Sequence, residues 1–228
     1  MDDIIITGSE EDAITWIKSN MSRAFDMTDL GLLHYCLGVE VWQTGRSIFV
    51  LLAKYVRSLL DKFRMEDCKI SCTPMEKGMK LSDKTDSKAV SESLYRQLVG
   101  SLIYLTTTRP DPSFVVSFIS RFMTMPEVEH WTTTKRALRY VKGTLDFGIL
   151  YSGSKDPRLC VYTDSDWEGS VDDKKSTSGH VFGLGMGVVT WTSKKQHAVA
   201  LSSTEAEYRG ALKGACEAFW LRRMLSVM

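Results

Sequence analysis

Four carboxylates stand out, by type and by place, as groups that could hold divalent metal ions. Asp2 and Asp3 are adjacent and come directly before a short β-branched run. Neighbouring carboxylates repel each other unless a cation shares them. Asp164 ends an apolar run expected to be a strand, and Glu207 lies at the start of a long helical pattern. Two-metal phosphoryl transfer needs several such oxygens converging on Mg²⁺ ions about 4 Å apart.

Each of these carboxylates also has an ordinary structural explanation. Asp2 and Asp3 could be an exposed acidic pair, and aspartates in turns and glutamates at helix starts are common capping choices. Asp166 rivals Asp164, because alternate residues of a strand share one face. Glu205 is likewise an alternative to Glu207, since both lie at the start of the predicted helix. The spacing alone therefore leaves both pairs open.

Composition bounds the class of protein. The chain has 228 residues, 43% of them hydrophobic, with a net charge of +1, so charge balance alone does not indicate nucleic acid. It holds no apolar run of the length that spans a membrane and no secretory leader pattern. Five scattered cysteines argue against a disulfide framework and fit a reducing compartment. We expect an intracellular, non-membrane protein of the cytoplasm or nucleus.

Periodicity in the first third predicts a strand, a helix, a hairpin and a second helix. Ile4 to Ile6 should be a buried strand, and the acidic segment 9–12 a capping box for the helix that follows. That helix places Ile14, Ile17, Met21 and Phe25 on one stripe. Segments 35–42 and 46–52 flank a Gln-Thr-Gly turn and should pair as a β-hairpin. A helix then begins near Ala53, with its inward residues being Val56, Leu59, Leu60 and Phe63.

The remainder divides into a polar connector, a helical segment and a sheet with a covering helix. Residues 76–92 are rich in Lys, Asp and Ser, which is typical of an exposed connector. Helical patterns follow at 94–105, 113–123 and 129–142. Segments 159–163, 180–184 and 188–192 predict a three-stranded antiparallel meander. The last helix, 204–225, is expected to turn these residues toward the sheet: Ala211, Leu212, Ala215, Ala218, Phe219 and Leu225.

Basic side chains gather at two places. Helical spacing puts Lys135, Arg136, Arg139 and Lys142 on one stripe that could follow a phosphate backbone, although a solvated helix face would have the same pattern. Lys194 and Lys195 follow a predicted strand and allow the same two interpretations.

Taken together, the segments resemble the Pol polyprotein of copia-type LTR retrotransposons over nearly the whole chain. No single motif is decisive, but many occur in one order. They are DDII (2–5), DLG (29–31), YCLGVE (35–40), YRQLVGSL (95–102), TRPD (108–111), KRALRYVKGT (135–144), YTDSDW (162–167), KSTSG (175–179), SKKQ (193–196) and ALSSTEAEY (200–208). The first three resemble the reverse transcriptase palm, the next three the connection region, and the last four the start of RNase H.

The resemblance implies an α/β (α+β) fold in three parts. Residues 1–75 would be the C-terminal part of the palm with the start of the thumb, 76–157 the linker and helical connection, and 158–228 the N-terminal half of an RNase H-like domain. Asp2 and Asp3 correspond to the paired palm aspartates, and Asp164 and Glu207 to RNase H ligands, all binding Mg²⁺ or Mn²⁺. The implied substrates are a primer–template and an RNA–DNA hybrid.

The same resemblance places further metal-binding aspartates outside this sequence, upstream for the polymerase and downstream for RNase H. We therefore expect the chain to be cut at both ends, its two metal sites to be partial and the fragment to be inactive alone, unless another Pol chain complements it. The alternative is a non-enzymatic nucleic-acid-binding or interaction protein captured from a transposon.

Overall fold

The computed structural model describes residues 4–84, 87–153 and 157–227. Close backbone contacts divide the chain into two compact units, Met1–His34 and Tyr35–Met228. The first unit holds one helix, and the second holds the two sheets and the remaining helices of the described chain. No helix in the described ranges is both long enough and apolar enough to cross a bilayer.

The first unit is built around helix α1 (Glu11–Ala24), as the sequence predicted. Two details of the prediction were wrong. Ile4 and Ile5 are more than half exposed and lie outside any strand, because a strand needs a bonded neighbour and no described strand pairs with this segment. The N-cap is Glu10, with no side-chain hydrogen bond to the helix, so the expected capping box does not form.

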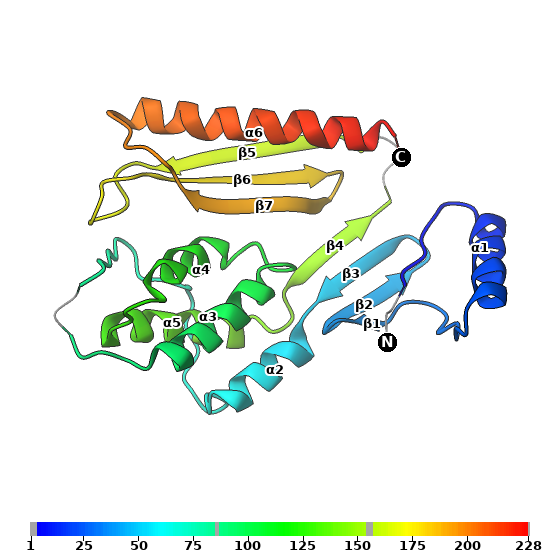
Figure 1. Cartoon of the computed structure of the whole chain (residues 1–228), viewed down its shortest axis with the longest axis horizontal. Coiled ribbons are helices and arrows are strands. Elements are labelled where there is room, and N and C mark those ends of the chain that lie inside the picture. The colour runs from blue at the N-terminus through cyan, green and yellow to red at the C-terminus, as the bar shows by residue number, and fades with distance from the viewer. Residues whose placement is uncertain (1–3, 85–86, 154–156, 228) are drawn as a thin grey trace. The chain divides into compact units, whose positions relative to one another are not determined.

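The second unit opens with a four-stranded antiparallel sheet in the order β1-β2-β3-β4 (Figure 1). Its strands are β1 (Tyr35–Cys36), β2 (Val39–Thr44), β3 (Ser47–Leu51) and β4 (Gly148–Ser152). The β2–β3 pair confirms the predicted hairpin, with Thr44 paired to Ser47 at its end. Strand β4 was not predicted: Gly148 pairs with Leu51 and Ser152 with Ser47.

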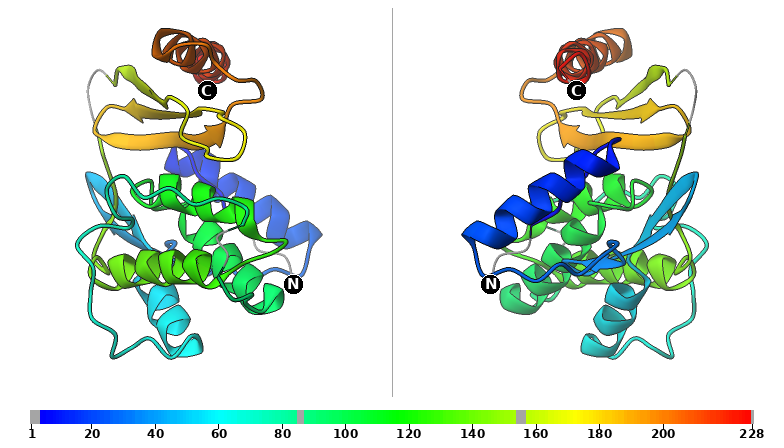
Figure 2. Two further views of the ribbon diagram at one scale, coloured as in Figure 1. Left: turned by 90° about the vertical axis from the view of Figure 1, so that its left-hand side faces the viewer. Right: turned by 90° about the vertical axis from the view of Figure 1, so that its right-hand side faces the viewer.

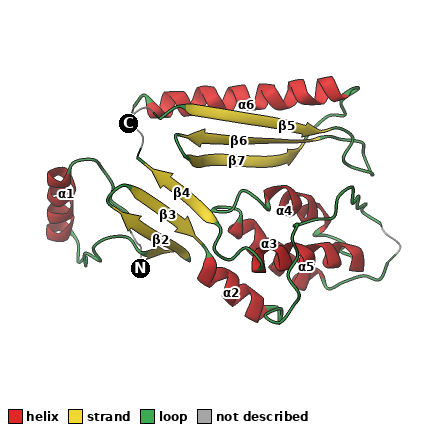
Figure 3. Ribbon diagram, turned by 180° about the vertical axis from the view of Figure 1, so that it is seen from behind, coloured by secondary structure: helices red, strands yellow, loops and turns green. Residues whose placement is uncertain are grey.

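Four helices of the described chain follow the hairpin or lie near this sheet (Figure 3), and their side chains form the main hydrophobic core. They are α2 (Ala53–Lys62), α3 (Glu92–Leu105), α4 (Ser113–Ile119) with a 3₁₀ turn (Ser120–Phe122), and α5 (Val128–Lys142). All match the predicted helical segments. The core side chains include Val56, Leu59, Leu98, Leu102, Ile119 and Leu138.

Two buried polar residues tie loops to this core. Arg109, 2% exposed, forms a two-pronged ion pair with Asp111 and donates to the carbonyl and hydroxyl oxygens of Thr144. His130 is fully buried; its Nδ1 accepts from the Glu127 amide, and its Nε2 lies 2.9 Å from the Ser82 carbonyl oxygen. Because Nδ1 is an acceptor, Nε2 carries the proton and the ring is neutral. These contacts hold the connector and the chain after α5 in place.

The second sheet is the predicted three-stranded antiparallel meander, β5 (Leu159–Asp166), β6 (Thr177–Leu184) and β7 (Gly187–Lys195). Helix α6 (Ser203–Leu225) lies along one face of it (Figure 2). The inward face predicted for α6 was wrong except at Ala218, which is half-buried and faces β5. Leu212 and Phe219 are 58% and 66% exposed, and the buried positions are Ala206, Gly210 and Gly214.

The physical reason for this difference is the distance between helix and sheet. A Cβ atom on Gly210 would lie 2.6 Å from Ser165 Oγ, and one on Gly214 would lie 2.7 Å from Thr163 Cγ2. Only residues without a side chain allow the helix backbone to approach this closely. The large apolar side chains of α6 must then face outward. The described chain is thus a mixed α/β protein with two antiparallel sheets.

Candidate functional site

The four predicted carboxylates fall into two groups. Asp2 and Asp3 lie outside the described residues. Asp164 lies near the end of β5, and Glu207 lies in the first two turns of α6, the helix that packs on β5. The candidate site that can be built from the structure is therefore the one at the β5–α6 junction.

Glu207 reaches β5 at the residue between the two rival aspartates. Its Oε1 accepts a hydrogen bond from the backbone amide of Ser165, 3.3 Å away. Ser165 is flanked by Asp164 and Asp166. One glutamate of α6 therefore contacts β5 at the residue between two aspartates. Strand β5 is an outer strand of its sheet, so one side of its backbone has no strand partner in that sheet.

The two aspartates lie on the opposite face of β5 from α6. Thr163 and Ser165 contact the glycine face of α6, so strand alternation turns Asp164 and Asp166 the other way. There they line a cavity of about 350 Å³ whose other wall includes Ser113 and Phe114 at the start of α4. The side chains of Asp164 and Asp166 therefore face the helices on that side of the sheet. Glu207 reaches β5 from the side of α6.

Asp166 is more engaged than Asp164. Its carboxylate occupies the space where a Cβ atom on Gly169 would stand, so it packs against the loop that follows β5. Its charge also acts on Arg121: burial lowers the pKa of that guanidinium, and the charges of Asp173 and Asp166 oppose the shift. The backbone of Asp164 pairs with Gly179 in β6, but no hydrogen bond or ion pair of its side chain is found in the described part of the chain. Asp164 is the carboxylate left available to a ligand from outside.

Glu205 likewise serves the local structure. Its Oε2 accepts from the Leu201 amide at 2.7 Å, and its Oε1 pairs with Arg209 at 2.6 Å. The backbone hydrogen bond from Leu201 is the main cause that lowers the pKa of Glu205; burial opposes it, and the charge and hydrogen bond of Arg209 add to the lowering. Ser202 completes the cap by accepting from the Glu205 amide. Glu205 thus caps α6, and Glu207 is the glutamate that touches β5.

Mg²⁺ favours carboxylate oxygens, so the type of side chain at this junction is suitable. The arrangement is less so. Within the described ranges, no group of three or more Asp, Glu, His or Cys side chains is placed to hold one metal ion. The side chains of Asp164 and Glu207 lie on different sides of β5, and a two-metal centre requires several carboxylates that converge on one point. These residues alone do not make a complete fit to the metal.

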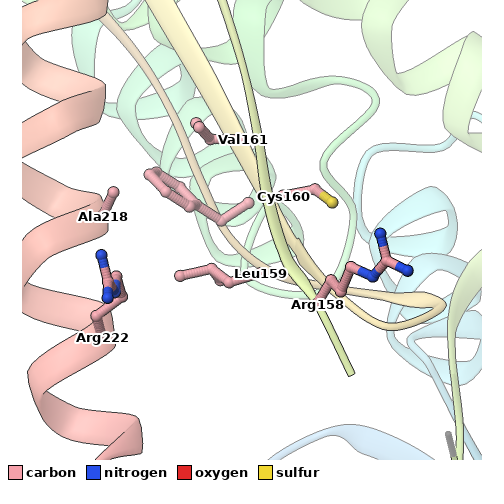
Figure 4. Close-up of a pocket in the computed structure, with 7 residues that line it drawn as sticks. Arg158, Leu159, Cys160, Val161, Ala218 and Arg222 are labelled. Atoms are coloured by element: carbon pink, nitrogen blue, oxygen red, sulfur yellow. The ribbon is translucent and has the colours of Figure 1, made fainter. Parts of the chain in front are cut away.

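A second cavity, of about 450 Å³, lies between the other end of β5 and the C-terminal half of α6. Figure 4 shows Leu159 and Val161 pointing toward Ala218 and Arg222, while Cys160 points away to the opposite face. The cavity is mainly apolar and contains no carboxylate. It confirms the alternation of β5 but adds no chemical group to the candidate site.

The basic stripe of α5 contacts the chain that follows α2. Arg136 donates to Glu76 at 2.8 Å and to Thr73 at 3.1 Å, and Lys142 donates to the Cys68 carbonyl oxygen at 2.6 Å. Lys135 lies over the ring of Trp131, 5.6 Å from its centroid. Arg139 is half-buried, with its Nε enclosed by protein. Much of the stripe therefore holds the chain after α2 against α5.

Lys194 and Lys195 differ from each other. Lys195 forms an ion pair of 2.7 Å with Asp173, which also pairs with Lys175. Partial burial raises the pKa of Asp173, but hydrogen bonds from Lys195, Ser170 and Lys175 outweigh it and lower the pKa well below its ordinary value. Lys194 is exposed. Of this pair, Lys194 is the cation open to a nucleic acid.

Sequence reasoning missed two residues of this junction, Ser165 and Gln196. Ser165 supplies the amide that Glu207 accepts from, and Gln196 lies buried between β6 and α6. A glutamine directly after the two lysines of a strand was a possible signal, because a long polar side chain at the buried end of a strand must find partners.

Comparison with known proteins places the chain in a family. Residues 1–77 match the family model described as reverse transcriptase (RNA-dependent DNA polymerase). The chain is 38% identical, over 99% of its length, to the retrovirus-related Pol polyprotein from transposon TNT 1-94 of Nicotiana tabacum, and covers 18% of that protein. It is 39% identical to the corresponding polyprotein from transposon RE1 of Arabidopsis thaliana, covering 15% of it.

A shorter relative aligns almost end to end. An uncharacterized mitochondrial protein of Arabidopsis thaliana is 36% identical over 96% of this chain and 91% of its own length. No solved structure matches. The chain spans less than a fifth of the length of the two Pol polyproteins, and each alignment covers 99% of the chain. It therefore belongs to the family of retrovirus-related Pol polyproteins encoded by copia-type transposons.

Proposed function

We propose that the chain is the part of a copia-type Pol polyprotein that joins its reverse transcriptase to its RNase H. In this proposal residues 1–75 form the end of the palm and the start of the thumb, 76–157 the connection, and 158–228 the first half of the RNase H-like domain. Asp2 and Asp3 serve the polymerase metal ions, and Asp164 and Glu207 serve the RNase H metal ions.

The observation that carries the RNase H assignment is the bond from the Ser165 amide to Glu207 Oε1. It holds a glutamate of α6 beside the strand that carries Asp164. The engagement of Asp166 by its own loop and of Glu205 by the helix cap supports the choice of Asp164 and Glu207. When bound, Mg²⁺ would supply charge for the scissile phosphate and activate the attacking water. With the missing ligands supplied by a further Pol chain, Asp164 and Glu207 would help to hold that ion beside the hybrid.

We expect the 228 residues on their own to make no DNA and to cleave very little RNA. Removing one preorganised charge from such a site typically costs about 3 kcal/mol of transition-state stabilisation or more. The described carboxylates do not form a group of three, so several such interactions would be missing. A further Pol chain would have to supply them.

The test is cleavage of a labelled RNA–DNA hybrid with Mg²⁺ or Mn²⁺, first by this chain and then with a second chain carrying the remainder of the Pol polyprotein. We expect no cleavage from the first sample and cleavage from the mixture. Asp164→Asn and Glu207→Gln should each abolish it, and Glu205→Gln should have a small effect. Cleavage by this chain alone would contradict its inactivity. Cleavage by the mixture that survives both substitutions would contradict the site.

The rival function is binding of nucleic acid without catalysis. The contacts of Arg136 with Glu76 and of Lys142 with the Cys68 carbonyl oxygen weigh against it, since those cations are already engaged. The exposed Lys194 weighs in its favour. Hybrid binding that weakens with salt and with Lys194→Glu, but is never followed by cleavage in the mixture, would favour this rival.

A further inference from the structure

One buried side-chain amide connects the elements that carry the proposed RNase H residues. Gln196, 3% exposed, follows the last residue of β7. Its Nε2 donates to Ser178 Oγ at 2.7 Å and to the Ala206 carbonyl oxygen at 2.9 Å. Its backbone amide donates to the Ser176 carbonyl oxygen at 2.8 Å. The side chain thus joins β6 to the first turn of α6.

Both ends of this network adjoin the proposed site. Ser178 Oγ lies 2.9 Å from Ser165 Oγ on β5, and Ser165 follows Asp164. At the other end, Ala206 precedes Glu207. The hydrogen bond from the Ser165 amide to Glu207 completes a ring of contacts that joins Gln196, Ser178, Ser165 and the start of α6. A displacement of the Gln196 side-chain amide would therefore move the Glu207 carboxylate relative to β5.

The glycine face of α6 makes the system stiff. Gly210 lies over Ser165 and Ser178, so close that a Cβ atom would be 2.6 Å from Ser165 Oγ and 3.4 Å from Ser178 Oγ. Steric contact sets how near α6 can come, but it does not fix how far the helix slides or turns on the sheet. The hydrogen bonds of Gln196 do, because hydrogen bonds are directional.

We propose that Gln196 is a positioning residue, which sets the Glu207 carboxylate against the Ser165 amide beside Asp164. This inference rests on the proposed function for its catalytic meaning, although the geometry it describes does not depend on cleavage. The role requires an amide: the Ala206 carbonyl accepts and cannot donate, so Nε2 must face it. Gln196 Oε1 is consequently buried without a hydrogen-bond partner in the described structure. The cost of that unpaired oxygen is tolerated where the amide nitrogen makes two bonds.

The test uses NMR of the 228-residue chain and needs neither metal nor substrate. The backbone amide proton shift of Ser165 is compared at one neutral pH in the parent and in Glu207→Ala, which removes the hydrogen-bond acceptor. The difference between the two shifts is the contribution of Glu207. The same pair of spectra is then recorded in Gln196→Met, which keeps the length of the side chain and removes its donors. Gln97→Met is the matched control, because Gln97 is exposed on α3.

We expect the Glu207 contribution to be present in the parent and in Gln97→Met, and to be largely lost in Gln196→Met while the spectrum stays dispersed. Loss of stability alone would not remove a hydrogen-bond shift from a folded protein. A Glu207 contribution that survives in Gln196→Met overturns the proposal. So does a parent in which Glu207→Ala leaves the Ser165 amide shift unchanged.

Should Gln196→Met not fold, Ser178→Ala provides the same test, since it removes one hydroxyl from the middle of the network. It is expected to reduce the Glu207 contribution, and an unchanged contribution overturns the proposal. The outcome is separate from that of the cleavage assay. A Glu207 contribution that depends on Gln196, together with cleavage that is unchanged by Asp164→Asn, would leave Gln196 as a positioning residue and remove the proposed nuclease site.

Discussion

Arg109 shows how much one buried charge can organise. Its guanidinium has four hydrogen bonds, two to Asp111 and two to Thr144, at 2% exposure. We expect Arg109→Met to lower the free energy of unfolding by about 3–5 kcal/mol, because it leaves a half-buried carboxylate and a carbonyl unpaired. Arg109→Lys should lose less, since the charge remains and only the fork of donors is lost. Urea unfolding measures both.

The matched control for this prediction is Arg96→Met. Arg96 also pairs with an acidic residue, Glu92, but its side chain is 51% exposed. Exposed pairs contribute at most about 1 kcal/mol. If the two Met substitutions have equal effects on unfolding, Arg109 does not organise the loop as described.

Asp173 gives the protein a defined response to acid. Its pKa is held below the ordinary value of 3.8, with burial opposing and the bonds from Lys195, Ser170 and Lys175 prevailing. A depressed carboxyl pKa contributes stability that is complete above the unfolded value and is lost as the pH falls below it. We expect the stability of the parent to drop below about pH 4 more steeply than that of Asp173→Asn. Thermal unfolding across this range checks it, and Asp146→Asn, at an exposed site, should retain the steep drop.

At the scale of elements, local patterns predicted helices and hairpins well. The segments predicted as helical became α2 to α6 with ends within a few residues, because capping residues and apolar periodicity are local properties. The face that α6 turns inward could not be read in the same way. Its apolar residues suggested a buried stripe through Leu212 and Phe219, but the sheet selects the glycines. Which partner a helix finds is a tertiary property.

The strand β4 was missed for a related reason. Gly148–Ser152 is short, follows a helix and has a glycine at its start, so it lacks the signal of a strand. Its partner β3 is far away in the sequence. The carboxylate pairs were likewise left open by periodicity and separated only by contacts, those of Asp166 with its loop and of Glu205 with the helix cap.

The β3–β4 contact makes a clear prediction about Gly148. A Cβ atom there would overlap the backbone oxygen of Val50 and meet the ring of Phe49. We expect Gly148→Ala to destabilise the second unit by about 1–3 kcal/mol, because backbone cannot move aside as a side chain can. Gly100→Ala, in α3 with open space around the site, should instead stabilise it by about 1 kcal/mol. Unfolding curves that show the same sign for both would contradict the packing of β4 on β3.

At the scale of the whole molecule, the two units should differ in protection from hydrogen exchange. Helix α1 has no buried residue, whereas α3 and α5 carry most of the fully buried side chains of the core. Amides deep in a packed core exchange only by larger openings. We expect mass spectrometry to find rapid exchange in 4–34 and the slowest exchange in α3 and α5. Equal protection of α1 and α5 would contradict the division at His34.

The pairing of β4 with β3 also dictates an order of events during synthesis. The β2–β3 hairpin and the helices from α2 to α5 can begin to form as each leaves the ribosome, since the backbone hydrogen bonds within each element are local. The outer edge of β3 must wait until Ser152 has been made, after a loop of roughly 100 residues. Until then the hairpin carries an unpaired edge, and this interval is when the nascent chain is most open to mispairing with another strand.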